Sequence, residues 1–434
     1  MKKHTQSPYE SSKVSYKPSG IEWLGEIPQS WKNVSIRSCF TESNQRCNTD
    51  SYPLLSVTIA NGIIYQDDIE NKKDISNDDK SNYKIVPLNA VAYNKMRMWQ
   101  GAVGVNTLTT GIVSPAYIVA IPNEKILPNF VSYLFKSKIM ISEFDKNSYG
   151  LCLDMNNLRY DDFRNIKIPL PPLQEQKEIA EFLDSKCEKI QNYIDKKQKL
   201  ITLLQEKKQA LINEVVTKGL NPNIELKSGI DYLGLIPHHW EVKKLKHICK
   251  INPQTNETLP NNFVYIDLES VAKGQLLKEQ TINKEQAPSR AQRILQKQDI
   301  LFQLVRPYQR NNYIFNKNGD YVASTGYAQI RTKECVNFVY YALLENSFVE
   351  RVILKSTGSN YPAITSNDFA DLKIPLPPLQ EQEEIAEFLD SKVAQIDSVI
   401  EKTKKQIKLI KEYKNTLINE AVCGRINLQK KERI

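Results

Sequence analysis

The sequence predicts an α+β chain, in which two β-rich globular domains are separated by a pair of long antiparallel coiled-coil helices. A stretch of twenty residues occurs twice, 206 positions apart and with one difference, as residues 167–186 (KIPLPPLQEQKEIAEFLDSK) and 373–392 (KIPLPPLQEQEEIAEFLDSK). A second motif, residues 20–31 (GIEWLGEIPQSW), recurs at an offset of 209 as residues 229–240 (GIDYLGLIPHHW). Between these motifs the two halves have diverged. The pattern predicts a pseudo-two-fold internal repeat, with a constant frame that carries two different heads.

The two repeats set the expected domain boundaries. Each half begins with the tryptophan-containing motif, continues as a variable region, and ends with a proline-rich hinge and a helix. In chain order we expect an N-terminal tail (1–20), a first β-rich domain (21–167), a hinge and spacer helix (168–220), a second β-rich domain (221–373), a second hinge and spacer helix (374–427), and a C-terminal tail (428–434).

The variable regions, residues 32–166 and 241–372, have the pattern of short strands. Apolar runs such as YPLLSVTI and SPAYIVAI in the first region, or FVYIDL and YAQIRT in the second, alternate with turn residues. A few helices are expected among the strands, including residues 128–144 and 336–354.

A long helix is expected after each hinge. Pro171 and Pro172 end the preceding structure, and residues 173–218 then contain no proline or glycine before Gly219 and Pro222. At 1.5 Å per residue, a helix of this length spans roughly 65–70 Å. The second half repeats the pattern. Two unrelated core helices are the alternative, but 18 identical residues out of 19 from 168 to 186 favour mutual pairing or a common partner.

One narrow apolar stripe runs along each helix at spacings of three and four residues, which is typical of a coiled coil. Because the first variable region precedes helix one and the second follows its end, the helices are expected to pair antiparallel. The seam residues are Ile179, Leu183, Ile190, Ile194, Ile201, Leu204 and Leu211 in the first helix, and Ile385, Leu389, Ile396, Ile400, Ile407, Ile410 and Leu417 in the second.

Composition indicates an ordinary globular protein whose charge suits a polyanion partner. The chain has 434 residues, 41% of them hydrophobic and 25% charged, with a formal net charge of +9. A basic balance of this size suits nucleic acid without requiring it. No apolar run approaches the roughly 20 residues of a membrane span. Seven cysteines without a CxxC pair favour a reducing compartment, so we expect a cytoplasmic protein.

One segment aligns between the variable regions and carries chemistry suited to DNA. Residues 91–100 (VAYNKMRMWQ) stand opposite 300–309 (ILFQLVRPYQ), so an arginine, an aromatic residue and a glutamine correspond. Arginine binds phosphate or guanine, and glutamine pairs with adenine. The candidate DNA-binding residues are Lys95, Arg97, Trp99, Gln100, Ser114, Arg306, Tyr308, Gln309, Arg310 and Ser324. The alternative is an arginine in a turn salt bridge and an aromatic in the core, and Tyr117 and Tyr327 are expected in the core.

Catalytic motifs are missing from the sequence. It has no GxxxxGK[ST] phosphate loop, no NPPF-type tetrapeptide of an adenine methyltransferase and no nuclease PD…ExK pattern. The residues Glu70, Asn71 and Lys72 match part of such a pattern by chance. A cluster of His238, His239, His247 and Cys249 lacks the spacing of a metal site. We therefore expect no catalytic residue, no metal and no cofactor in this chain.

The two repeated motifs resemble the DNA-specificity subunit of type I restriction–modification systems. The resemblance includes GIEWLGEIPQSW, IPLPPLQEQ and EIAEFLDSK, and extends to residues 94–120 and 299–311. It implies two target-recognition domains, each reading one half of a split, asymmetric DNA target. It also implies assembly with two adenine-methylating subunits, which dock on the helices, and with ATP-driven restriction subunits. Those partners would use S-adenosylmethionine, ATP and Mg²⁺.

The residues alone agree with this resemblance and leave one alternative. Identical heads related by a dyad would read a palindrome, so different heads predict two different half-sites around an unread gap set by the helices. The alternative is a coiled-coil scaffold that joins two protein-binding heads without contacting DNA. Sequence also leaves open whether a restriction subunit accompanies the chain.

Overall fold

The computed structural model describes residues 15–47, 52–69, 79–150, 156–229, 232, 234–255, 257–426 and 428. It divides into two compact units, residues 1–197 with 405–434 and residues 198–404. Each unit therefore holds one head and a part of each long helix, α4 (Leu173–Lys218) and α9 (Leu379–Val422). Within the described residues no helix is both long enough and apolar enough to cross a membrane.

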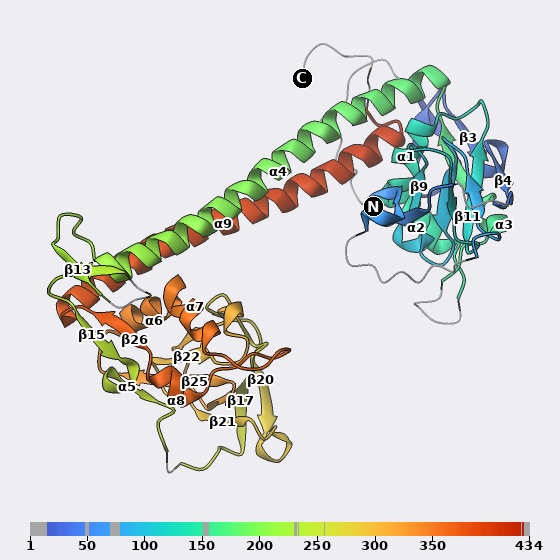
Figure 1. Cartoon of the computed structure of the whole chain (residues 1–434). Helices are drawn as coiled ribbons and strands as arrows, with labels where there is room; N and C mark the ends of the chain where they lie inside the picture. Colours follow the sequence, from blue (N-terminus) through green and yellow to red (C-terminus); the bar gives the residue numbers. More distant parts are fainter. Residues whose placement is uncertain are drawn as a thin grey trace, which may run out of the picture. The chain divides into compact units, whose positions relative to one another are not determined.

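The first head, residues 16–170, is built mainly of short strands (Figure 1). Its helices are α1 (Pro128–Lys136), α2 (Lys138–Lys146) and α3 (Tyr160–Phe163), with 3-10 turns η1 (Ile36–Ser38), η2 (Gln66–Asp68) and η3 (Met98–Gln100). Its strands are β1 (Tyr16–Pro18), β2 (Glu26–Pro28), β3 (Lys32–Ser35), β4 (Phe40–Ser43), β5 (Leu55–Thr58), β6 (Gly62–Tyr65), β7 (Lys84–Val86), β8 (Val91–Asn94), β9 (Val103–Val105), β10 (Gly111–Val113), β11 (Tyr117–Pro122) and β12 (Lys167–Leu170).

The second head, residues 226–376, repeats this plan. Its helices are α5 (Leu245–Ile248), α6 (Val336–Leu344), α7 (Asn346–Leu354) and α8 (Ser366–Ala370), with turns η5 (Lys284–Gln286) and η6 (Pro307–Gln309). Its strands are β13 (Leu226–Ser228), β14 (Leu235–Pro237), β15 (Glu241–Lys244), β16 (Cys249–Ile251), β17 (Asn262–Ile266), β18 (Val271–Ala272), β19 (Gln275–Leu276), β20 (Gln280–Asn283), β21 (Ala291–Ile294), β22 (Asp299–Gln303), β23 (Tyr313–Phe315), β24 (Tyr321–Ser324), β25 (Tyr327–Thr332) and β26 (Lys373–Leu376).

The sheets of the two heads have the same topology despite their divergent sequences. The antiparallel order β4-β11-β8-β9 of the first head corresponds to β16-β25-β22-β23 of the second. A second sheet has the order β20-β17-β24-β21, with β17 and β24 parallel. In the first head its counterpart is two strand pairs, β5 with β6 and β7 with β10, joined by a parallel bridge between Leu54 and Ile112. The internal repeat therefore extends through the variable regions.

The hinges are part of the heads. Strand β12 pairs with β3, and β26 pairs with β15, so residues 168–170 and 374–376 complete the domains that they follow. Strand β1 likewise pairs with β2, which places Tyr16–Pro18 in the first head and not in a tail. The expected boundaries at 167 and 373 thus fall within β12 and β26, and the one at 20 separates β1 from its partner β2; sequence repeats alone do not locate these pairings.

The expected helices at 128–144 and 336–354 are each broken in two. The break lies at Ser137 in the first head and at Glu345 in the second, where the backbone is extended. The Ser137 hydroxyl accepts a hydrogen bond from Met140 N (3.3 Å), and the Glu345 carboxylate accepts from Phe348 N (2.8 Å). Both residues thus cap the following helix, which a continuous apolar pattern conceals.

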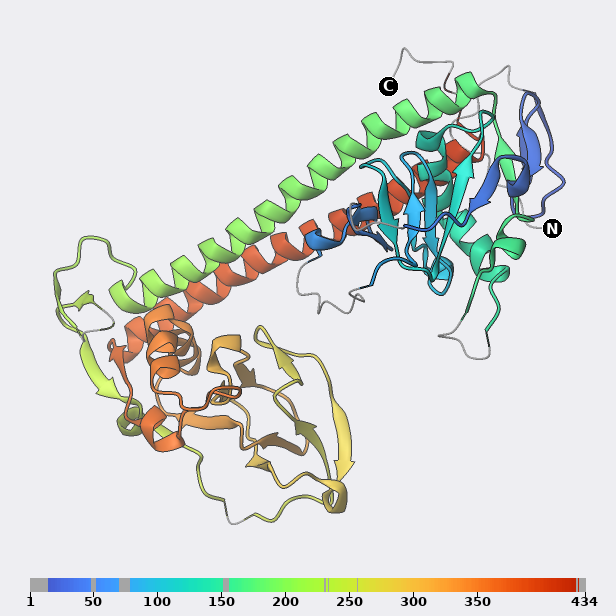
Figure 2. The ribbon, with the colours of Figure 1, turned by 45° about the vertical axis from the view of Figure 1, so that its right-hand side comes forward.

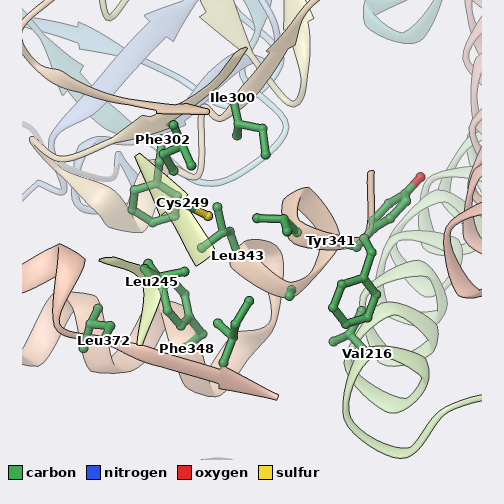
Figure 3. Close-up of a cluster of buried hydrophobic side chains, with 14 of the residues drawn as sticks. Val216, Leu245, Cys249, Ile300, Phe302, Tyr341, Leu343, Phe348 and Leu372 are labelled. Atoms are coloured by element: carbon green, nitrogen blue, oxygen red, sulfur yellow. The ribbon is translucent and has the colours of Figure 1, made fainter. Parts of the chain in front are cut away.

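The long helices contribute to the core of each head. In the second unit Ile212, Val215 and Val216 of α4 belong to the same buried cluster as Trp240 and the sheet residues Ile300 and Phe302. Figure 3 shows part of this cluster, which includes Val216 of α4 and Tyr341 of α6. From α9, Ile385 and Leu389 join it as well, so these two predicted seam residues also belong to the core of the head.

The stretches of α4 and α9 within each unit lie side by side and run antiparallel (Figure 2). In the second unit, Lys208 Nζ of α4 lies 2.7 Å from Asp397 Oδ1 of α9. None of the fourteen predicted seam residues is exposed: Leu204, Leu211, Ile396 and Ile410 are half-buried and the others are buried. Lys208, which interrupts the apolar stripe, is therefore accommodated by an ion pair at the edge of the seam.

A tryptophan and a glutamate fasten each head to its helix. Trp31 Nε1 donates to Glu175 Oε2 (2.7 Å), and Trp240 Nε1 donates to Glu381 Oε2 (3.1 Å). Both indole rings are buried. Because each pair joins the tryptophan-containing motif to the duplicated block, these contacts explain part of the identity between the halves.

Glycine is required where each long helix ends. Gly219 and Gly424 have φ of +75° and +73°, a left-handed conformation that ends helices. A Cβ atom on Gly219 would lie 3.3 Å from the Trp240 ring, and one on Gly424 would lie 3.0 Å from the Trp31 ring. The end of each long helix therefore packs closely against the buried tryptophan of the head in its own unit.

A buried glutamine locks each hinge. Gln176 Nε2 donates to the carbonyl of Pro171 (2.8 Å), and its Oε1 accepts from Leu127 N (2.8 Å), just before α1. Gln382 makes the same two contacts at the equivalent positions of the second head. Because these bonds involve backbone atoms, they hold the start of the helix against a head of any sequence.

We expect Gln176→Leu to lower the free energy of unfolding of the first unit by about 2–4 kcal/mol, since it leaves buried backbone groups without partners. Urea unfolding monitored by tryptophan fluorescence measures this change. Gln174→Leu is the matched control, because Gln174 is exposed and its replacement is expected to change stability by less than about 0.5 kcal/mol. Equal effects of the two substitutions would show that the hinge bonds contribute nothing specific.

Candidate nucleic-acid interface

The two segments predicted to contact DNA occupy the same turn of the fold. We call them the basic turns, residues 95–101 and 304–310. Each follows a central strand of its antiparallel sheet, β8 or β22, and contains a 3-10 turn, η3 or η6. The alignment of residues 91–100 with 300–309 is therefore correct in three dimensions. Loops at strand ends, carried by a rigid sheet, are common binding surfaces.

The first basic turn presents several of its predicted side chains. Arg97 and Gln100 are exposed, and Lys95 and Trp99 are half-buried. Met98 is fully buried and anchors the turn. The Trp99 indole donates to the carbonyl of Met96 (3.1 Å), so its ring is fixed by the turn itself. A cation, an amide and an immobilised ring thus stand together at this surface.

The second basic turn divides its side chains between solvent and the protein. Tyr308 and Gln309 are exposed, and Arg306 is half-buried. Gln309 Oε1 accepts from the buried Gln303 Nε2 (2.8 Å), which leaves the Gln309 NH₂ group to donate outward. Arg310 instead donates to Asn346 Oδ1 (2.7 Å), so it braces the turn and is a poor candidate for contact with DNA.

The two serines predicted to contact DNA differ in their exposure to solvent. Ser114 is half-buried, whereas Ser324 is 3% exposed and its hydroxyl accepts from Gly326 N (3.1 Å). A buried side chain offers no surface to a duplex, so Ser324 is removed from the predicted contacts. Tyr327 is fully buried, as expected, and Tyr117 is half-buried.

In each head a cationic side chain links the basic turn to the end of the neighbouring helix, but the cation comes from the helix in the first head and from the turn in the second. In the first head, Lys136 at the end of α1 donates to the carbonyls of Gly101 (3.0 Å) and Ile59 (2.6 Å). In the second head, the turn itself supplies Arg310, which reaches back to Leu344 O (3.4 Å) at the end of α6. Burial lowers the pKa of Lys136 to about 8. Both heads therefore join the end of the basic turn (Gly101 or Arg310) to the end of the helix (Lys136 or Leu344), with the positive charge on opposite partners.

Sequence reasoning missed a second loop beside the turn in the second head. Thr357 and Ala363 exchange backbone hydrogen bonds (2.9 and 3.0 Å), which closes a tight loop, and Ala363 also bridges Val305 of the basic turn. Tyr361 at its tip is 64% exposed. The signal available in the sequence was an aromatic residue within a run of turn-forming residues, 356–362 (STGSNYP). In the first head an equivalent bridge joins Tyr149 to Asn157, but residues 151–155 between them lie outside the described part.

The histidine and cysteine cluster has structural roles where it is seen. His239 Nε2 lies 2.7 Å from Glu381 Oε2, beside the tryptophan contact. Cys249 is buried, and burial raises the pKa of its thiol to about 11, which disfavours the reactive thiolate. Throughout the described ranges, no group of three or more histidine, cysteine, aspartate or glutamate side chains is placed to hold a metal ion. The residues Glu70, Asn71 and Lys72 lie outside those ranges.

Comparison with known families finds the same duplication. The model of the type I restriction modification DNA specificity domain matches the chain twice, over residues 31–203 and 237–409. The type I restriction enzyme MjaVIII specificity subunit of Methanocaldococcus jannaschii is 27% identical over 343 residues, covering 74% of this chain and 75% of the relative. The putative type I restriction enzyme MjaX specificity subunit of the same organism is 26% identical over 438 residues, covering 94% and 96%.

Two solved structures have a similar fold. A chain from a study of complex assembly and conformational transition of the type I R-M system has a TM-score of 0.69 at 17% identity, and the match covers 91% of this chain and 98% of that one. The crystal structure of the HsdS subunit from Thermoanaerobacter tengcongensis has a TM-score of 0.52 at 18% identity, covering 92% and 98%. The two-headed α+β fold with long helices is thus confirmed.

Proposed function

This chain belongs to the family of type I restriction–modification DNA specificity domains, and on that premise we propose that it reads the DNA target of a type I complex. The curated relatives are specificity subunits, so the chain is non-catalytic and catalysis lies in other subunits. The first head then serves as the first recognition domain and the second head as the second. S-adenosylmethionine, ATP and Mg²⁺ would bind the partner subunits.

The observation that carries this proposal is a contrast between two parts of the chain. The frame, which consists of the tryptophan-containing motifs, the hinges and the long helices, is similar in the two halves, whereas the basic turns differ. The two recognition domains share a sheet topology, and they share hinge contacts through Trp31, Glu175 and Gln176 or their equivalents. The basic turns occupy equal positions with different residues. We therefore infer that each domain reads a different short sequence, which makes the target bipartite and asymmetric.

The helices are proposed to set the unread gap between the two half-targets. Helix α4 has 46 residues and α9 has 44, and each passes from one compact unit into the other without a break. A fixed length of paired helix makes the spacing of two readers a geometric property of the protein, as half-site spacing is in dimeric readers.

The duplicated block also carries a surface that internal contacts do not explain. The buried residues of the block, and the glutamates Glu175 and Glu381, contact the head. In contrast, Leu173 and Leu379, the first residues of α4 and α9, are 46% and 51% exposed. Glu181 and Ser185 and their equivalents are exposed as well. Identical exposed residues on two halves that diverged elsewhere indicate two copies of one partner. We propose that a methyltransferase subunit docks at the start of each helix.

Leu173→Glu combined with Leu379→Glu is expected to abolish stable assembly with the methyltransferase subunits, because a charge replaces an apolar contact at each docking surface. Either substitution alone is expected to leave one methyltransferase subunit bound. Co-purification with subunit counting by native mass spectrometry measures both outcomes. Leu354→Glu is the matched control, since Leu354 is exposed but lies outside the duplicated block. Full assembly of the double variant would place the docking surface elsewhere.

A scaffold that joins two protein-binding heads remains the competing function. A scaffold function does not explain why Arg97 and Arg306 occupy equivalent positions in the two domains, nor why the net charge is +9. Retention of the assembled complex on immobilised DNA separates the two functions. A DNA reader elutes earlier as salt rises and prefers its target sequence, whereas a scaffold shows no sequence preference.

A further inference from the structure

Arg306 is held in an unusual conformation next to an exposed ring. Its backbone is left-handed, with φ of 54° and ψ of 55°, which costs energy for any residue with a side chain. Its N–H donates to the carbonyl of Pro362 (2.7 Å), and its guanidinium carbon lies 4.2 Å from the centre of the Tyr361 ring. Strain that the surrounding structure maintains is often found at functional sites.

The loop that carries the contacting ring is closed by backbone hydrogen bonds. Tyr361 lies in the loop closed by Thr357 and Ala363, where Gly358 adopts a φ of +105° and a Cβ would lie 3.3 Å from Tyr361 O. An aromatic face holds the plane of a guanidinium and leaves its edge free to donate. The arginine is therefore oriented before any ligand arrives.

The donors of Arg306 differ from those of two other arginines in the second head. Arg310 is bound to Asn346, and Arg331 is bound to Asp299 through two hydrogen bonds (2.8 and 2.9 Å). The Arg306 guanidinium forms no hydrogen bond or ion pair with the residues that the structure describes, and its Nε is buried. The two terminal nitrogens therefore form its available edge.

We propose that the Arg306–Tyr361 stack reads one guanine of the second half-target, an inference that rests on the proposed function. Guanine presents N7 and O6 side by side in the major groove, and they match two parallel N–H donors. Arginine can bind a phosphate through the same pair of donors, but only contact with the base makes binding depend on the identity of the base pair. Arg306 contacts the base, and Tyr361 is a positioning residue.

The test uses the chain assembled with its methyltransferase subunits. Methylated motifs in cells first define the target, and competition binding then measures the preference for guanine over adenine at each guanine of the second half-target. Arg306→Lys keeps the charge but loses the paired donors. We expect this variant to lower the preference roughly 10- to 100-fold at one position and to leave the first half-target unaffected.

Two further variants separate positioning from folding. Tyr361→Leu is expected to lower the same preference, whereas Tyr361→Phe, which keeps the ring, retains most of it. Arg351→Lys is the matched control, since Arg351 lies 5.9 Å from the Tyr232 ring, outside the basic turn, and its preference should equal the wild type. An unchanged preference at the other positions of the second half-target shows that the second head of each variant is folded.

Two results overturn the inference. If Arg306→Lys weakens binding equally for all sequences, the arginine contacts phosphate. If the variant leaves the preference for guanine unchanged at every position, Arg306 reads no base, because lysine can replace arginine at a phosphate but not at the paired acceptors of guanine. In both cases the wild-type complex still selects its target and the proposed function stands. A wild-type complex without sequence preference overturns the proposed function together with this inference.

Discussion

Four residues inserted into both long helices are expected to lengthen the unread gap of the target and to leave both half-targets unchanged. The insertion points are between Lys197 and Gln198 of α4 and between Lys404 and Lys405 of α9, where both helices pass from one compact unit into the other. Four residues add about 6 Å along the axis and rotate the distal part about 40° past a full turn, which a coiled coil absorbs as a stutter. At about 3.4 Å per base pair, the gap grows by roughly two pairs.

Insertion into one helix alone provides the control for this prediction. It shifts one side of the seam past the other, so that residues such as Ile201 and Ile400 lose their partners, and assembly is expected to fail. The methylated motifs of cells that carry each variant report the result. An unchanged gap after the double insertion would show that the helices serve only for docking.

Exchange of residues 32–166 for those of another family member is expected to replace one half of the methylated motif completely. The other half and the gap should stay as they are. The structure explains why the exchange is tolerated: Trp31, Glu175 and Gln176 remain with the frame, and Gln176 binds only backbone atoms of the incoming domain.

One side-chain contact restricts the choice of donor domain for this exchange. Tyr133 donates to Asp184 of the frame (2.6 Å), and Tyr341 makes the equivalent bond to Asp390 (2.7 Å). The donor should therefore carry a tyrosine at that position. Exchange of residues 241–372 is the reciprocal control and should replace the other half. A change in both halves after either exchange would mean that the domains do not read independently.

The frame could be predicted because its signals are local or repeated. A proline-rich hinge, a run free of proline and glycine, and an apolar stripe define each helix without knowledge of its surroundings. The alignment of Arg97 with Arg306 worked for a similar reason, since both follow a strand at one offset. These features depend on spacing along the chain, which sequence displays directly.

The remainder depends on contacts between distant residues. Arg310 could not be distinguished from Arg306 by sequence, because only the fold brings Asn346 to one and Tyr361 to the other. Ser324 was predicted to be accessible, but it lies in strand β24, where the fold buries its side chain. The helix breaks at Ser137 and Glu345 are decided by capping within apolar runs, where the pattern continues unchanged.

The most direct test of the proposed function is the adenine methylome of cells that contain the methyltransferase subunits, with and without this chain. We predict methylation at one motif, made of two different short sequences around an unread gap of fixed length, and its complete loss when the chain is removed. The same motif without the chain, or a continuous or palindromic motif that depends on it, would contradict the account of two different readers on one frame.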